Sequence, residues 1–245
     1  MYRKRTYRNL IRGTGLVSFQ VVVKETDLSV YAVKPLVDIT REIILEYRGY
    51  IEAHIQRYPD FATILIPWHT PNPVPAIIQD MIAAGEKAGV GPMASVAGVI
   101  AEYVGRRLLP YSDEVIIENG GDIFVKKNTP VTVAVFAGKS PLSLKIGLRI
   151  DPGGLPIAVA TSSGTVGHSL SFGKADAVCV ISRSCALADA AATSVGNHVK
   201  SKHDIENSLE FGKSIPGVTG LLIIIGDKLG AWGDLEIVPI QGKKC

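Results

Sequence analysis

The stretch EVIIENGGDIFVKK, residues 114–127, decides how this chain folds. It holds two runs rich in β-branched and aromatic residues, and the sequence ENGGD lies between them. Because Asn-Gly and Gly-Gly readily form two-residue turns, the runs are predicted to be neighbouring antiparallel strands. A glycine pair also lets a backbone approach a ligand closely, because no Cβ intervenes. The local sequence favours a turn, and a ligand-facing backbone is the alternative.

Further strand-like runs lie on both sides of this stretch. Residues 15–34 alternate apolar and polar side chains around a polar centre, which predicts a β-hairpin. The later runs are mostly separated by Gly, Pro, Asn or Asp, and short connections of this kind favour antiparallel pairing. They span residues 131–137, 144–150, 157–163, 176–182, 218–227 and 234–241.

Helical periodicity marks the segments that flank the strands. The predicted helices span residues 35–58, 76–89, 91–110, 187–200 and 204–212. Pro92 occupies a first helical position, which suits its fixed φ angle. Strands therefore cluster between groups of helices instead of alternating with them. This order predicts an α+β fold with a mostly antiparallel sheet, in a single domain covering residues 1–245.

Composition and charge exclude several classes of protein. The chain has 245 residues, 47% of them hydrophobic and 20% charged, which is the balance of an ordinary globular protein. Its net charge of +3 is too small to indicate a nucleic-acid partner. No signal peptide or long apolar run is present, so a cytoplasmic protein with no membrane partner is expected. Cys179, Cys185 and Cys245 form no metal-binding or disulfide pattern, which indicates reduced thiols.

The run CALADAAATSVGN, residues 185–197, places one acid among very small residues. Asp189 and Thr193 are four residues apart, so on a helix their oxygens lie on one face and can converge. Magnesium prefers hard oxygen ligands, one or two carboxylates together with phosphate oxygens from a substrate. An acid early in a helix also suits the helix dipole as a cap. Spacing alone leaves metal ligation and capping as equal alternatives.

Two other stretches are candidates for ligand contact. ATSSGTVGHS, residues 160–169, offers hydroxyls and unhindered N–H groups at the end of a strand, which suit phosphate or carbonyl oxygens. An ordinary exposed turn has the same composition. Ala97, Gly98 and Ala101 form a small-residue strip along the helix at 91–110. Such a strip admits either another helix or a ligand close to the helix axis.

Taken together, these stretches resemble a known family. SVAGVIAEYV, IENGGDIF, ATSSG and ADAAAT follow the order and approximate spacing of motifs in the ApbE family, the FAD:protein FMN transferases. The run SSGTVGHSLSFGKADAV is typical of a cytoplasmic UPF branch of ApbE-like proteins. The resemblance covers residues 91–197. It implies an ApbE-like, T-fold-like domain with helices packed on its sheet.

The resemblance also implies roles for individual residues. A magnesium ion would be held by the carboxylate of Asp189, the hydroxyl of Thr193 and the main-chain carbonyl of Ala192. The positions implied in cofactor binding are Gly98, Glu102, Asn119, Gly120, Gly121, Asp122, Ser162, Ser163 and Gly164. FAD or FMN is the implied ligand, and the ion would neutralise the diphosphate as a phosphoryl group moves to an acceptor protein.

Two departures from the family pattern concern catalysis. The transferases carry a Lys-Gly pair followed by an Asp, where this chain has Ala97, Gly98 and Glu102. They also carry a His-Ile-x-Asp-Pro-x-Thr-Gly segment after the Ser-Gly turn, and the corresponding segment here is too short to contain it. His168 is the candidate catalytic substitute. One hypothesis is therefore a divergent flavin transferase or FAD diphosphate-cleaving enzyme, and the alternative is a non-catalytic flavin- or nucleotide-binding module.

Overall fold

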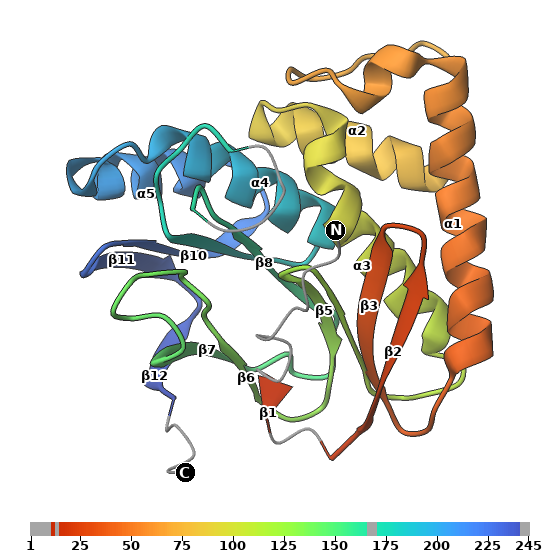
Figure 1. Cartoon of the computed structure of the whole chain (residues 1–245), viewed down its shortest axis with the longest axis horizontal. Helices are drawn as coiled ribbons and strands as arrows, with labels where there is room; N and C mark the ends of the chain where they lie inside the picture. The colour runs from red at the N-terminus through yellow and green to blue at the C-terminus, as the bar shows by residue number, and fades with distance from the viewer. Residues whose placement is uncertain (1–10, 13–14, 166–170, 241–245) are drawn as a thin grey trace.

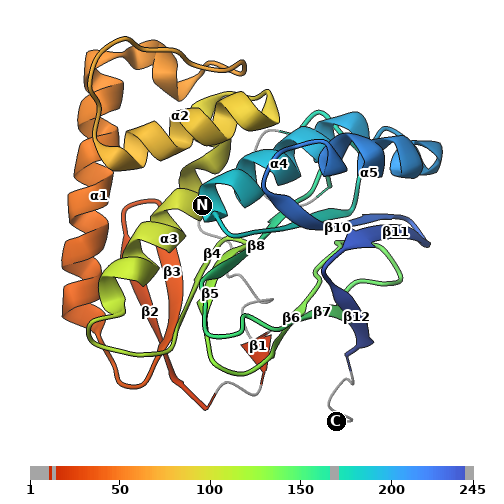
Figure 2. The ribbon, with the colours of Figure 1, turned by 180° about the vertical axis from the view of Figure 1, so that it is seen from behind.

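The computed structural model describes residues 11–12, 15–165 and 171–240. These residues form three layers (Figures 1 and 2). Helices cover one face of a large sheet, and a smaller sheet lies against the other face. Every strand pairing within the described part of the chain is antiparallel. The predicted α+β class with a mostly antiparallel sheet is confirmed.

The large sheet contains eight of the described strands in the order β11-β10-β9-β8-β5-β4-β3-β2. Their bounds are β2 Val17–Val23, β3 Thr26–Ala32, β4 Val115–Asn119, β5 Asp122–Lys126, β8 Ile157–Ser162, β9 Ala177–Ser182, β10 Val218–Ile225 and β11 Lys228–Gly233. Strands β4 and β5 lie at the centre of this order and are buried along almost their whole length, as their continuous apolar runs require. The predicted hairpin at residues 15–34 is β2 and β3.

The β4–β5 connection is the tight turn that its sequence favours. Asn119 pairs with Asp122, and the two glycines between them have φ angles of 72° and 123°. Positive φ at both central positions is accessible to glycine and strained for other residues, so Gly120 and Gly121 allow the two-residue connection. The turn therefore fixes the register of the two central strands.

The smaller sheet has the strand order β1-β6-β7-β12. Its bounds are β1 Ile11–Arg12, β6 Val131–Ala134, β7 Ile146–Ile150 and β12 Glu236–Pro239. An apolar core between the two sheets includes Ile116, Val125 and Leu148, none of which is more than 1% exposed. Alternate residues of β4 and β5 point to this core, and the others point to the helices.

The helical layer encloses the larger apolar core. Its bounds are α1 Val37–Arg57, η1 Pro59–Ala62, α2 Ala76–Ala88, η2 Pro92–Ser95, α3 Val96–Leu108, α4 Cys185–His198, η3 Lys202–Asp204 and α5 Ile205–Lys213. Phe61, Met81 and Phe124 are among its fully enclosed side chains. Helix α4 is composed mostly of small residues, which lets it lie close to both α3 and the sheet.

Several elements differ from the sequence-based prediction, which does not include β1, η1 or β11. Strand β11 was not expected, because KLGAWG contains two glycines and its residues are exposed or half-buried. Its pairing with β10 stabilises it, and that pairing is not visible in a local pattern. The helix expected at 91–110 begins with a separate 3₁₀ turn, η2, before α3 starts at Val96.

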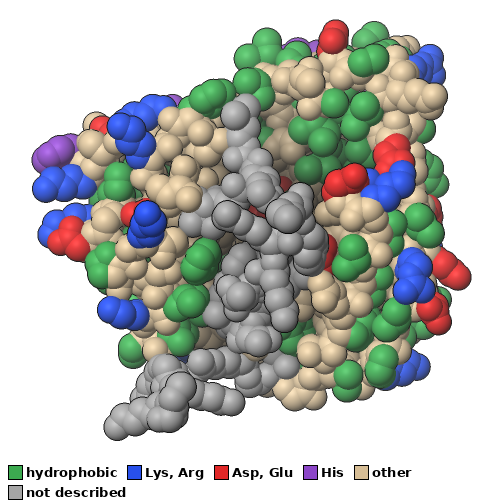
Figure 3. Space-filling model, viewed as in Figure 1, with side chains coloured by type: hydrophobic (Ala, Val, Ile, Leu, Met, Phe, Trp, Pro, Cys, Tyr) green, Lys and Arg blue, Asp and Glu red, His purple; other side chains and the backbone are tan. Residues whose placement is uncertain are grey.

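Charged side chains lie mainly over α1 on one flank and over α5 and β11 on the other (Figure 3). On the α1 flank they form mixed-sign pairs, such as Lys24 with Glu52 at 2.7 Å and Arg48 with Glu25 at 2.6 Å. Exposed pairs of this kind contribute little to stability. Within the described ranges, no single helix is long and apolar enough to span a membrane, although α2 with residues 92–108 passes that test as a pair bent by 104°.

Candidate functional site

Some of the predicted site residues, among them Gly98, Glu102 and Asp189, meet where α3 crosses α4. Gly98 lies at this crossing, and a Cβ built on it would lie 2.3 Å from the carbonyl oxygen of Cys185 and 2.9 Å from the Cβ of Asp189. No larger side chain fits there without separating the helices. The small-residue strip of α3 therefore admits another helix at Gly98, which was one of its two interpretations.

Each of these two helices supplies a carboxylate to the N-terminal turn of the other. Asp189 of α4 accepts a hydrogen bond on Oδ2 from the backbone N–H of Gly98, at 2.9 Å. Glu102 of α3 accepts one on Oε2 from the backbone N–H of Cys185, at 2.7 Å. The first turns of helices carry unsatisfied N–H groups and partial positive charge, so both carboxylates are well placed to cap them. Ser184 adds a cap to α4 by accepting from the N–H of Leu187.

Asp189 is thus a cap, but for α3 and not for its own helix. The residue as a whole is partly exposed, whereas its carboxyl group is enclosed between the two helices. Burial raises the pKa of Asp189 to about 7, and the hydrogen bonds from the Gly98 and Ala97 N–H groups act in the opposite direction. Ionised Asp189 is therefore under-solvated, and a nearby cation would favour its ionised form.

Negative charge accumulates around the first turn of α4. Burial raises the pKa of the Cys185 thiol well above its usual range, and the charges of Glu102, Asp122 and Asp189 raise it further. Arg106 opposes them and contacts Oε1 of Glu102 at 2.8 Å. The charges of three carboxylates therefore raise the pKa of the Cys185 thiol, and the charge of Arg106 lowers it.

The Gly-Gly turn lies beside this crossing. The side-chain amide of Asn119 donates to the carbonyl of Ala97 at 3.0 Å, which joins the end of β4 to the first turn of α3. A Cβ built on Gly121 would lie 3.3 Å from the carbonyl oxygen of Thr161, near the end of β8. The turn therefore lies between the start of α3 and the end of β8, with Gly120 exposed and Gly121 half-buried.

The described part of the Ser-rich stretch, residues 160–165, includes the end of β8 and the residues directly after it. Ser162 Oγ lies 3.8 Å from the position that a Cβ on Gly196 would take. Ser163 Oγ accepts from the N–H of Thr165 at 3.1 Å, and Gly164 donates to the carbonyl of Ala175 at 2.9 Å. These residues are held by local hydrogen bonds, and the Ser162 hydroxyl lies beside α4.

The metal ligands implied by the resemblance are all on α4. Thr193 is half-buried, and its hydroxyl makes no hydrogen bond to another described residue. Ala192 is buried in the middle of the helix, where a carbonyl normally accepts from the N–H four residues later. No group of three or more His, Cys, Asp or Glu side chains in the described part of the chain could hold a metal ion. An ion at Asp189 and Thr193 would therefore need oxygens from its ligand, which is how Mg²⁺ usually binds with nucleotides.

The structure thus brings Gly98, Asn119 and Asp189 together, with the Gly-Gly turn and Ser162 close by. Glu102 also lies at the crossing, but both of its carboxylate oxygens already contact backbone or Arg106. His168 lies outside the described residues. The sequence reasoning missed Arg106, although its position four residues after Glu102 on one helix was a recognisable signal.

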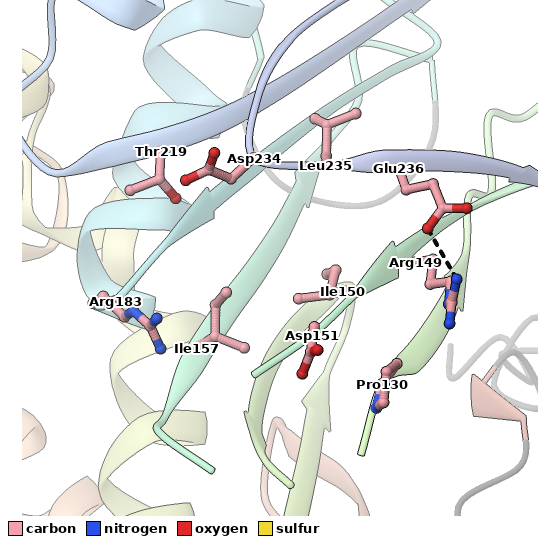
Figure 4. A pocket seen from close by; sticks show the side chains of 10 residues that line it. All are labelled: Pro130, Arg149, Ile150, Asp151, Ile157, Arg183, Thr219, Asp234, Leu235 and Glu236. Carbon is pink, nitrogen blue, oxygen red and sulfur yellow. Dashed lines mark hydrogen bonds and ion pairs between the residues drawn. The ribbon is translucent and has the colours of Figure 1, made fainter. Parts of the chain in front are cut away.

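A separate cavity of about 580 Å³ lies elsewhere, between the large and the small sheet (Figure 4). It is lined by residues of β7, β8, β10 and β12 and of the segments next to them. No residue of the α3–α4 crossing contributes to it.

Comparison with known proteins links this fold to one family. The family model described as AbpE bacteria matches residues 8–224. A UPF0280 protein of Methanocella arvoryzae is 42% identical over 217 residues, which cover 87% of each chain. A UPF0280 protein of Methanococcus aeolicus is 41% identical over 204 residues, covering 81% of this chain and 82% of the relative.

Solved structures show the same fold at low sequence identity. The flavinyl transferase ApbE of Pseudomonas stutzeri in its apo form aligns with a TM-score of 0.57 and 13% identity, over 89% of this chain and 94% of that one. The ApbE protein of Thermotoga maritima aligns with a TM-score of 0.53 and 14% identity, over 88% and 96% of the two chains.

Proposed function

This chain belongs to the ApbE-like family represented by the AbpE bacteria model and the UPF0280 relatives, and on that premise we propose that it binds a flavin nucleotide with a divalent metal ion at the α3–α4 crossing. The observation that carries the proposal is the enclosed carboxyl group of Asp189, which lies one helical turn from the Thr193 hydroxyl, a group with no hydrogen-bond partner among the described residues. An apolar pocket alone would not need such a pair of oxygens.

Asp189 and Thr193 would hold the ion. Mg²⁺, when bound, neutralises part of the charge on a diphosphate. The carboxylate of Asp189 has about four acceptor positions, and the N–H groups of Gly98 and Ala97 use two of them, so lone pairs remain for the ion. Asp189 therefore serves two purposes in the proposal: it fixes the start of α3 and it orients an oxygen toward the ligand.

The two turns would contact the nucleotide itself. Gly120 and Gly121 carry no side chain, so a planar or phosphorylated group can reach their backbone. Ser162 and Ser163 would donate hydroxyl hydrogen bonds to phosphate oxygens. In the transferase version of the proposal, an acceptor hydroxyl forms a bond to the FMN phosphorus of FAD and releases its proton to solvent. The bond between that phosphorus and the bridging oxygen breaks, and AMP leaves with that oxygen. An acceptor protein and a cytoplasmic location are further parts of this proposal.

A binding experiment tests the site directly. Purified protein is titrated with FAD, FMN and ADP by calorimetry, each with and without Mg²⁺, and its visible spectrum is recorded. We expect Mg²⁺ to tighten diphosphate binding, and Asp189→Asn to remove that dependence. Asp38→Asn is the matched control, because Asp38 is an exposed acid of α1 paired with Arg41. Binding that is absent for all three nucleotides, or unchanged in Asp189→Asn, would refute the metal site.

A second candidate function is a binding module without chemistry. It is favoured by the short segment after the Ser-Gly turn and by Ala97, which stands where the transferases have lysine. Incubation with FAD and Mg²⁺ separates the two functions, because only an enzyme releases AMP or produces a flavinylated protein. Tight binding with no AMP released over hours would identify the module.

A further inference from the structure

The cavity between the two sheets is built by irregular backbone at the start of β10. The pairing of β9 with β10 shifts register between Val218 and Gly220, so Thr219 is an extra, bulged residue. Bulges redirect side chains, and Thr219 points into the cavity (Figure 4). Its hydroxyl donates to the carbonyl of Ile181 at 3.3 Å and retains its capacity to accept.

The turn after β11 closes tightly onto this bulge. Asp234 donates its N–H to the carbonyl of Thr219 at 2.9 Å, and Gly233 has a φ angle of 91°. A Cβ on Gly233 would lie 2.1 Å from the Thr219 carbonyl oxygen, so a glycine is required. The close approach holds the Asp234 carboxylate at the cavity rim (Figure 4).

Three of the five charged residues that line the cavity form no ion pair with another lining residue. The other two, Arg149 and Glu236, form an ion pair at 3.1 Å and neutralise each other. Arg183 donates one hydrogen bond to the carbonyl of Pro156, and Asp151 accepts one from the N–H of Gly153.

No salt bridge joins Arg183, Asp151 or Asp234 to a charged residue in the part of the chain that the structure describes. One positive and two negative groups therefore face a shared space.

The remaining lining is apolar. Ile150 and Ile157 are buried side chains of the core between the sheets, and Leu235 is half-buried. The volume of about 580 Å³ is within the range of about 300–1,000 Å³ that small-molecule sites have. A ligand for this cavity combines an aliphatic body with charges opposite to those of the wall.

We propose that this cavity binds a basic amino acid, a molecule with one carboxylate and two cationic nitrogens joined by an aliphatic chain. Its carboxylate pairs with Arg183, and its nitrogens pair with Asp151 and Asp234. Its methylene groups lie against Ile150 and Ile157. The ligand charge of one negative and two positive groups complements the wall charge. The site is separate from the α3–α4 crossing and does not depend on flavin binding.

Three probe molecules test this assignment on the wild-type protein at low ionic strength. L-lysine has all three charged groups, L-norleucine lacks the terminal ammonium, and cadaverine lacks the carboxylate. Arg183, Asp151 and Asp234 are exposed, and ion pairs with exposed groups are weak, so we expect lysine to bind at least about threefold more tightly than either of the others in calorimetry. Equal affinities for the three probes, or no saturable binding of lysine, would overturn the proposal.

Two variants assign the charges within the site. Arg183→Gln should weaken the binding of lysine and norleucine by about threefold and leave that of cadaverine unchanged. Asp234→Asn should weaken the binding of lysine and cadaverine by about threefold. The double variant with Arg149→Gln and Glu236→Gln is the matched control, and its lysine affinity should stay within about twofold of the wild type. A folded variant that weakens all three probes equally, or none of them, would contradict the proposal. If a variant does not fold, the comparison of the three probes on the wild-type protein decides.

Discussion

Asp189→Asn should make the ligand-free protein more stable at neutral and alkaline pH while abolishing metal-dependent binding. The asparagine keeps an oxygen that can accept from the N–H of Gly98, so this bond of the α3 cap survives. What the substitution removes is a negative charge enclosed between α3 and α4. A substitution that damages function and improves stability is characteristic of a functional site.

The magnitude follows from the pKa. The ordinary value for an aspartate is 3.8, and burial raises the pKa of Asp189 to about 7 in the folded chain. Since each pKa unit corresponds to about 1.36 kcal/mol, ionised Asp189 lowers the free energy of unfolding by at most about 4 kcal/mol. Solvent access to part of the residue reduces this to about 2–4 kcal/mol.

The effect of Asp189 on the free energy of unfolding depends on pH. Between pH 4 and 7 the folded chain binds more protons at Asp189 than the unfolded chain does, so raising the pH lowers stability. The penalty is small near pH 4 and complete above pH 7. The stability gain of Asp189→Asn should therefore increase by about 2 kcal/mol between pH 5 and pH 8.

Urea denaturation of the wild type and Asp189→Asn at pH 5 and pH 8 measures this gain, with Asp38→Asn as the exposed control. In thermal unfolding each kcal/mol corresponds to about 2–4 °C for a chain of this size. Adding Mg²⁺ with ADP at pH 8 should stabilise the wild type and leave the Asn variant unchanged. An Asn variant that is less stable than wild type at pH 8, or a gain that does not grow with pH, would refute the reasoning.

Other consequences concern packing and capping. Gly98→Ala should lower the free energy of unfolding by about 1–3 kcal/mol in urea denaturation, because its Cβ would overlap α4. Gly49→Ala, on the open side of α1, should raise the free energy of unfolding by up to about 1 kcal/mol. Glu102→Ala should lower the free energy of unfolding by about 1–3 kcal/mol, because it leaves the buried N–H of Cys185 without a hydrogen bond. Glu102→Gln should lower it by less, because the amide oxygen can still accept that bond. Cys179 and Cys185 should resist iodoacetamide until the chain unfolds, because burial raises the pKa of both thiols; rapid native-state labelling of either, detected by mass spectrometry, would contradict this.

Local chemistry in the sequence determined much of the fold. The Asn-Gly-Gly-Asp run specified the β4–β5 turn because only glycine adopts two successive positive φ angles easily. Helical periodicity located α1 and α2 within one or two residues of their observed bounds. These predictions succeeded because the decisive interactions lie within a few residues of one another.

The role of Asp189 required the tertiary structure. Its spacing to Thr193 permitted either a metal ligand or a cap, and the structure shows a cap on a helix that begins 93 residues earlier, at Val96. The same holds for the cavity between the sheets, where Asp151, Arg183 and Asp234 come from separate segments. Charge pairing and close packing act through space, so a sequence pattern supplies the groups and only the folded chain decides which of them meet.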